Sequence, residues 1–146
     1  MMLPNLLIGY MNMHDINIRH TRLICARDAL HDGGTGVRFS LPQHSVDVID
    51  GVSNNGQIQN AFAIAFQGQV YAYQNCCPHL GTELDWQPGE VFDETGLYLI
   101  CATHGAAFEP DSGRCIGGPC LGASLKKIAV KVENNQVVLN GVVPFL

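Results

Sequence analysis

Two short motifs combine a cysteine and a histidine at a spacing that suits metal binding. The first is Cys77-Pro78-His79, and the second runs from Cys101 to His104 as CATH. Thiolates and imidazoles together fit two metal sites. One is a tetrahedral zinc ion that takes all four ligands. The other is a two-iron cluster, with two thiolates on one iron and two imidazoles on the other.

The pairing of ligand types favours the second site. Zinc sites usually pair like ligands within a motif, as cysteine with cysteine and histidine with histidine. Here each motif supplies one cysteine and one histidine, so that each could reach both irons of a cluster. Gly81 and Gly105 follow the histidines, and we expect them to let each loop turn tightly and to leave amides free to face an anion such as a sulfide. A structural zinc module remains the alternative from a different class.

The segments that must position these motifs have the texture of short strands. Ala61–Phe66 and Gln69–Tyr73 flank the turn Gln67-Gly68, and their alternation of residues predicts a hairpin with one packed face. No window of twelve residues has a good helical period. We predict an all-β, antiparallel sandwich or barrel of short strands. The further predicted strands are 21–26, 37–41, 46–49, 97–101, 107–109, 114–116, 127–132 and 137–139.

Length and composition agree with one compact domain. The chain has 146 residues, of which 47% are hydrophobic and only 14% charged. We expect 21–146 to form this domain. We expect residues 1–20 to be an N-terminal extension that is poorly ordered or not native, since Met11 and Met13 are plausible alternative starts. With no apolar run of about 20 residues and no signal peptide, we expect no membrane association and a cytoplasmic location with reduced thiols.

The charge is distributed unevenly. The net charge is −5, and all 8 basic residues lie outside residues 39–113. A window with acids and no bases repels nucleic acid and favours a basic protein partner. A solvated acidic surface that only keeps the protein soluble is the plainer alternative. The acids in the window are Asp47, Asp50, Glu83, Asp85, Glu90, Asp93, Glu94, Glu109 and Asp111.

The segment from about Ala61 to Leu139 resembles the Rieske iron–sulfur domain family. CPHLGTEL is similar to the family's C-P-H-x-G-x-x-L, and CATHGAAFEPDSGRC is similar to C-x-x-H-G-x-x-F-x-x-x-x-G-x-x. The hairpin AFAIAFQGQVYAYQN and the Gly118-Pro119 loop followed by Leu125 also match in order. The spacer between the motifs is longer than usual, and we place the extra length at Gln87–Gly96 as an extended surface hairpin.

This resemblance implies a [2Fe-2S] cluster and its ligands. The thiolates would come from Cys77 and Cys101 and the imidazoles from His79 and His104, within a cluster-binding subdomain of two hairpin loops at about residues 75–122. High-potential members carry a disulfide between the ligand loops, and this chain has Thr82 and Thr103 at those positions.

Those members also have a serine and a tyrosine that donate hydrogen bonds to the cluster, where this chain has Ala106 and Phe108. With fewer hydrogen bonds to sulfur, the reduced cluster is less stabilised. The resemblance therefore implies a potential near the low end of the Rieske range, about −150 mV.

The function implied by the resemblance is electron transfer rather than catalysis. A ferredoxin of this type would take one electron from a flavoprotein reductase and pass it to a terminal oxygenase or reductase. A Rieske small subunit of a nitrite reductase-like enzyme is the alternative that the sequence leaves open. His79 and His104 would form the exit for the electron, with Leu80 and Pro119 as an apolar rim. The acids that we expect to steer a basic partner are Glu83, Asp85, Glu90, Asp93 and Glu94.

The remaining residues of interest have plainer interpretations. The other histidines lie at positions 14, 20, 31 and 44, which leaves no room for the 2-His-1-carboxylate iron domain of an oxygenase. Cys25 and Cys76 are expected to be small buried hydrophobes. Cys115 and Cys120 have the same interpretation, with pairing or redox sensing as the alternative. Trp86 is expected to anchor the packing of the long spacer.

Overall fold

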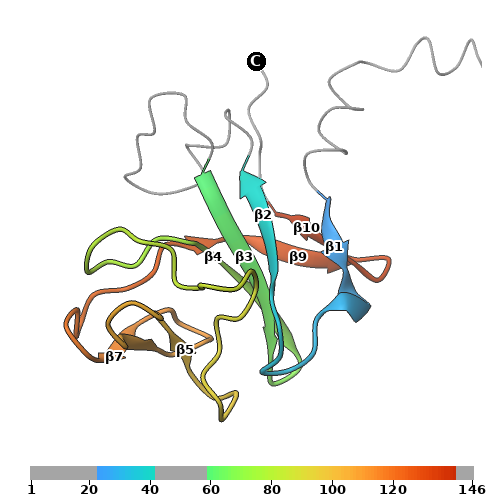
Figure 1. Cartoon of the computed structure of the whole chain (residues 1–146). Coiled ribbons are helices and arrows are strands. Elements are labelled where there is room, and N and C mark those ends of the chain that lie inside the picture. Colours follow the sequence, from blue (N-terminus) through green and yellow to red (C-terminus); the bar gives the residue numbers. More distant parts are fainter. Residues whose placement is uncertain (1–22, 42–58, 141–146) are drawn as a thin grey trace, which may run out of the picture.

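The computed structural model describes residues 23–41 and 59–140, which form three antiparallel sheets (Figure 1). One three-stranded sheet has the order β1-β10-β9, a four-stranded sheet has the order β2-β3-β4-β8, and a second three-stranded sheet has the order β5-β6-β7. The described part contains one short 3-10 turn, η1 (Arg27–Ala29), and no helix there is long and apolar enough to cross a membrane. The all-β, antiparallel prediction is confirmed. The strands are β1 Leu23–Ala26, β2 Val37–Leu41, β3 Gln59–Phe66, β4 Gln69–Gln74, β5 Leu99–Ile100, β6 Ala107–Phe108, β7 Cys115–Gly117, β8 Lys127–Ile128, β9 Val130–Glu133 and β10 Gln136–Leu139.

Strand β3 is buried on both of its faces. Its alanines at positions 61, 63 and 65 belong to a core with Val137 and Leu139 of β10. Phe62 and Ile64, on the opposite face, belong to a second core with the β5-β6-β7 side of the molecule. The prediction of a sheet with one packed face is therefore wrong, because small side chains admit a second sheet on the face where they lie. Figure 1 shows β5 and β7 on one side of β3, and β1 and β10 on the other.

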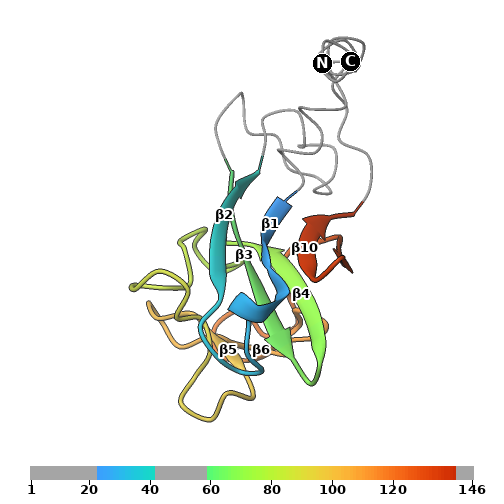
Figure 2. The same cartoon turned by 90° about the vertical axis from the view of Figure 1, so that its right-hand side faces the viewer.

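The turns of two hairpins explain their register. In the β3–β4 hairpin, Gln67 and Gly68 both have positive φ, as does the pair Asn134 and Asn135 between β9 and β10. Two residues with positive φ match the right-handed twist of the paired strands, so both hairpins close with two-residue turns. Figure 2 shows the β3–β4 hairpin from the side of the molecule that carries β1 and β10.

The strand predicted at 127–132 divides in two at Ala129. Strand β8 pairs with β4, where Ala72 lies opposite Ile128, whereas β9 pairs with β10 in the other sheet. The break transfers the chain from one sheet to the next, and Ile128 and Val130 both contribute to the core between them. The strand predicted at 46–49 and the extension at 1–20 lie outside the described residues.

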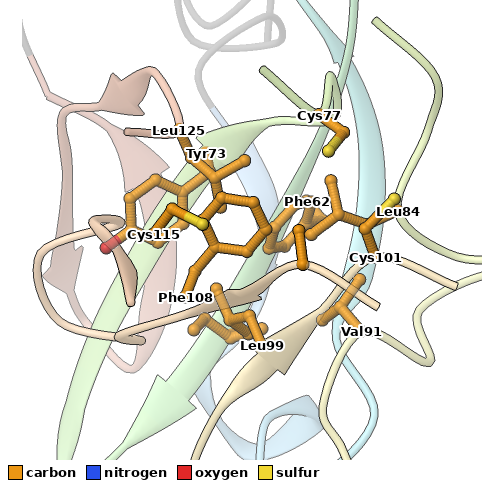
Figure 3. Packing of buried hydrophobic residues seen from close by; sticks show 12 residues of the cluster. Phe62, Tyr73, Cys77, Leu84, Val91, Leu99, Cys101, Phe108, Cys115 and Leu125 are labelled. Atoms are coloured by element: carbon orange, nitrogen blue, oxygen red, sulfur yellow. The ribbon is translucent and has the colours of Figure 1, made fainter. Parts of the chain in front are cut away.

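The core on the β5-β6-β7 side holds the larger side chains. It contains Phe62, Tyr73 and Phe108, whose rings lie together in its centre (Figure 3). Cys77 and Cys101 belong to the same core, and each is 2% exposed. Two of the four sequence-predicted site residues are thus part of the apolar packing.

Candidate metal centre

The two loops that carry the site residues have the same backbone hydrogen bonds. In the first loop, the Gly81 amide donates to the Cys77 carbonyl at 2.7 Å, and the Cys77 amide donates to Thr82 O at 2.7 Å. In the second, the Gly105 amide donates to Cys101 O at 2.9 Å, and the Cys101 amide donates to Ala106 O at 2.9 Å. The cysteine therefore occupies the same place in each loop.

The glycine in each loop is used differently from our expectation. Gly81 has φ +78° and Gly105 has φ +76°, a conformation that glycine adopts without the penalty of a side chain. The tight turns are confirmed. The amides are not free to face an anion, because each donates to the carbonyl of the cysteine that opens its loop.

The structure brings the four predicted site residues together in two pairs. The buried thiols of Cys77 and Cys101 share a side-chain hydrogen bond. The rings of His79 and His104 are exposed, with centroids 5.1 Å apart in an edge-to-face arrangement. Among residues 23–41 and 59–140, no three histidine, cysteine or acidic side chains form a group that could hold a single metal ion. Two buried thiols and two exposed imidazoles are the donor set that a two-iron cluster of this kind needs.

Backbone amides favour the thiolate form of Cys101. Burial acts to raise its pKa, but hydrogen bonds from the backbone of Thr103 and His104 and from the side chains of Cys77 and Thr82 together lower the pKa. The pKa of Cys77 is raised, chiefly by burial, although the backbone of His79 acts in the opposite direction. The His79 amide thus points at the sulfur of Cys77, and the Thr103 and His104 amides point at that of Cys101, as expected of groups that stabilise a metal-bound thiolate.

A buried polar network supports the first loop. The Asn75 side chain donates to Asp85 Oδ1 at 2.9 Å and accepts from the Leu84 amide at 2.8 Å. Asp85 Oδ2 accepts from the Gly89 amide at 2.7 Å and lies 3.8 Å from Arg38 Nε. The Asp85 side chain is fully buried, so the prediction that Asp85 steers a partner is wrong. Its carboxylate instead ties together both ends of the loop that holds Cys77 and His79.

The charge near the first loop is also partly compensated. Arg38 of β2 lies 2.6 Å from a carboxylate oxygen of Glu83, and the same oxygen accepts from the Asn60 side chain at 2.7 Å. Glu83 is therefore a weaker source of negative field than we expected. Glu90 and Asp93 line a hollow beside the loop that precedes β2. The residues of that loop in the hollow are Gly33, Gly34 and Thr35.

The support of the second loop is mostly apolar. Gly118 packs so closely on it that a Cβ there would lie 2.8 Å from the Cα of Ala106. The Tyr73 hydroxyl donates to Pro110 O at 2.6 Å, which fixes the turn between β6 and β7. Burial, together with the nearby Asp111, raises the pKa of Tyr73. A backbone hydrogen bond also joins the two loop regions, from the Ala102 amide to Leu84 O at 2.8 Å.

The long spacer is a hairpin only in its second half. Phe92 bridges Leu99, and the Asp93 amide donates to Tyr98 O, as expected of an extended hairpin. Val91, before it, is completely buried. Trp86 is 78% exposed, so its interpretation as a packing anchor is wrong.

Three supporting residues escaped the sequence analysis. Asn75 and Arg38 carry no motif, and their role depends on a carboxylate that the fold brings to them. Cys120 was not linked to the site, yet it shares a side-chain hydrogen bond with Cys77. Its position directly after Gly118-Pro119, a loop that belongs to the family resemblance, was the available signal.

The match to a known family covers the described fold. A model of the Rieske [2Fe-2S] domain matches residues 23–137. The chain therefore belongs to the Rieske [2Fe-2S] domain family. No curated protein sequence matches the chain.

Solved structures with this fold come from several bacteria. The chain is 21% identical to the ferredoxin of carbazole 1,9a-dioxygenase from Nocardioides aromaticivorans IC177, with a TM-score of 0.57 over 81% of this chain and 93% of that one. It is 20% identical to a Sphingomonas yanoikuyae B1 ferredoxin, with a TM-score of 0.55 over 83% and 97%. It also matches a chain from a complex of reduced oxygenase and oxidized ferredoxin in carbazole 1,9a-dioxygenase, at 21% identity and a TM-score of 0.52 over 79% and 96%.

Proposed function

We propose that the chain is a one-electron carrier that holds a Rieske [2Fe-2S] cluster through Cys77, Cys101, His79 and His104. The observation that carries this proposal is the convergence of two buried thiols and two exposed imidazoles from two loops with the same hydrogen bonds. When bound, such a cluster takes up and releases one electron at a time.

The residues of the chain would divide two tasks between them. Cys77 and Cys101 would hold one iron inside the apolar core, where water is excluded. His79 and His104 would hold the other at the surface, where a partner can approach closely. The exposed Leu80 beside His79 would give a docking partner an apolar contact.

The proposed partners are a flavoprotein reductase as donor and a terminal oxygenase as acceptor. Support comes from the solved structures, since several with this fold are ferredoxins of dioxygenase systems or complexes of such a ferredoxin with its oxygenase. The chain itself would not catalyse a reaction on the substrate. Of the acids expected to steer a basic partner, Glu90 and Glu94 are the exposed ones without a described ion pair.

Substitution of the ligands tests the proposal. Protein purified without oxygen should absorb visible light and give an electron paramagnetic resonance signal after reduction with dithionite. Cys77→Ala and His104→Ala should each abolish the signal and the bound iron. Cys25→Ser and His31→Ala are matched controls outside the site and should retain both. Full iron content in the first two variants would contradict the proposal.

The reduction potential tests the kind of carrier. Ala106 and Phe108 offer no hydroxyl to a cluster sulfur, so we expect a midpoint toward the low end of the family range, about −150 mV. Protein-film voltammetry gives the value directly. A midpoint above about +100 mV would place the protein with the high-potential members instead.

A further inference from the structure

Two cysteines outside the proposed ligand set lie in contact with each other. The Sγ atoms of Cys115 and Cys120 are 3.3 Å apart, and both residues are free thiols. A disulfide bond needs a separation of about 2.05 Å, so the two sulfurs would have to approach by roughly 1 Å.

The backbone between these cysteines holds them in place. The Cys115 amide donates to Ala123 O at 2.7 Å, and Cys115 O accepts from the Gly122 amide at 3.1 Å. The Ala123 amide donates to Cys120 O at 2.9 Å, which closes the loop over residues 115–123. These backbone hydrogen bonds therefore hold the two cysteines close together, so that their contact does not depend on the side chains alone.

The pair reaches the proposed metal centre through Cys120. The Cys120 thiol donates to Cys115 Sγ at 3.3 Å, and Cys77 Sγ is an alternative acceptor for the same proton. Cys115 is completely buried in the core that contains Cys77 and Cys101, and Cys120 packs against the same core from a partly exposed position. A reagent can thus meet Cys120 first, with Cys115 behind it.

We propose that Cys115 and Cys120 form a reversible dithiol–disulfide site, and that its oxidation withdraws the Cys120 thiol from Cys77. The co-reactant is a low-molecular-weight disulfide such as oxidised glutathione. The Cys120 thiolate attacks one of its sulfurs, the reagent's S–S bond breaks, and one glutathione leaves as a thiolate that takes up a proton. Cys115 then attacks Cys120 Sγ and releases the second glutathione, so that two protein thiols are oxidised as one disulfide is reduced to two thiols.

The second half of this inference rests on the proposed function. Hydrogen bonds to a metal-bound sulfur stabilise the reduced, more negative centre and raise its potential. A Cys120 thiol can supply such a bond to Cys77, whereas a disulfide sulfur has no proton to donate. Oxidation of the pair should therefore lower the potential of the centre.

Peptide mapping tests the disulfide directly. The full-length protein is treated with oxidised glutathione without oxygen, unfolded in iodoacetamide and cleaved with trypsin. Cleavage after Arg114 and Lys126 releases one peptide, residues 115–126, that contains both cysteines. We expect this peptide to lose two hydrogen atoms and to take up no iodoacetamide. Dithiothreitol before alkylation should restore two alkylated cysteines.

The controls separate this pair from the other thiols. Cys25→Ser and Cys76→Ser should close the pair as the unaltered chain does, whereas Cys115→Ser should hold a glutathione on Cys120. Two alkylated cysteines after treatment, or a bond from Cys120 to Cys76, would overturn the proposal.

The link to the metal centre has its own measurement. Voltammetry should show a lower midpoint potential than that of the untreated chain in two samples: protein with the Cys115–Cys120 disulfide closed, and the Cys120→Ala variant. The potential of Cys120→Ser, which retains a hydroxyl donor, should change less. An unchanged potential after complete closure would refute the link. If untreated protein has no iron–sulfur signal, the proposed function fails, yet the peptide map still decides whether the disulfide forms.

Discussion

The two ligand loops have the same backbone but depend on different surroundings. Each opens on a cysteine whose carbonyl accepts from a glycine four residues later. The first loop is held by a buried polar network around Asp85, and the second by close apolar packing of Gly118 on Ala106. The local turn therefore depends on the motif, whereas the orientation of each loop depends on residues outside it.

Loss of the carboxylate should give the largest effect on stability. Asp85→Ala leaves the Gly89 amide, the Asn75 side chain and part of Arg38 without their acceptor, so we expect a loss of about 3 kcal/mol in the free energy of unfolding. Urea unfolding measures it. Hydrogen exchange should rise over residues 77–84 more than over 101–106. The exposed Glu90→Ala is the control, with a change within about 0.5 kcal/mol. Uniform exchange in both loops would remove the distinction between their supports.

Crowding of the second loop should come next. Gly118→Ala sets a methyl group 2.8 Å from Ala106 Cα at a residue with φ +92°, so we expect a cost of about 2 kcal/mol. Gly122→Ala is a matched control, since Gly122 has φ +91° with open space around it and should lose only about 1 kcal/mol. In Gly118→Ala, hydrogen exchange should rise over residues 101–106. Equal losses of unfolding free energy in the two variants would show that the close contact between Gly118 and Ala106 does not affect stability.

The hydrogen bond from Tyr73 should contribute less. Tyr73→Phe removes the donor to Pro110 O and should cost about 1 kcal/mol, while Tyr71→Phe, on the same strand, should stay within about 0.5 kcal/mol. Because burial raises the pKa of Tyr73, the phenol stays protonated in the folded state while it ionises in the unfolded one. Stability should therefore fall as the pH rises above about 10, and less steeply in Tyr73→Phe. The same slope in both proteins would contradict this.

The smallest difference should lie between the two loop glycines. Gly81→Ala and Gly105→Ala each place a side chain at positive φ with no atom closer than 4.0 Å, so we expect about 1 kcal/mol from each. The two costs should agree within about 0.5 kcal/mol. Thermal unfolding of both variants measures them side by side. A gap above about 1 kcal/mol would show that the turns are not equivalent.

The sequence predicted the parts of the site that depend on neighbouring residues. The spacing in Cys77-Pro78-His79 and in Cys101 to His104, the glycines after them and the β3–β4 turn are local patterns, and the structure shows the expected turns. The burial of Asp85 was not predictable in this way, because a carboxylate reads as surface until its distant partners are known. The exposure of Trp86 was not predictable either, because no local pattern shows whether another segment covers the side chain.

The second packed face of β3 was hidden for a related reason. The alternation of alanine with larger residues was read as one buried face, since alanine fits surfaces as well as cores. Only the return of β10, at the far end of the chain, shows that both faces are covered. Contacts between distant segments, such as that of Cys120 with Cys77, are likewise absent from any local pattern.

Metal analysis of the purified chain tests the central claim most directly. Protein isolated without oxygen should contain two irons and two acid-labile sulfides per chain, as a [2Fe-2S] cluster requires, and reduction with dithionite should produce its paramagnetic signal. The account predicts that both are lost when His79 or Cys101 is replaced by alanine. One zinc per chain, with no iron and no signal, would contradict it.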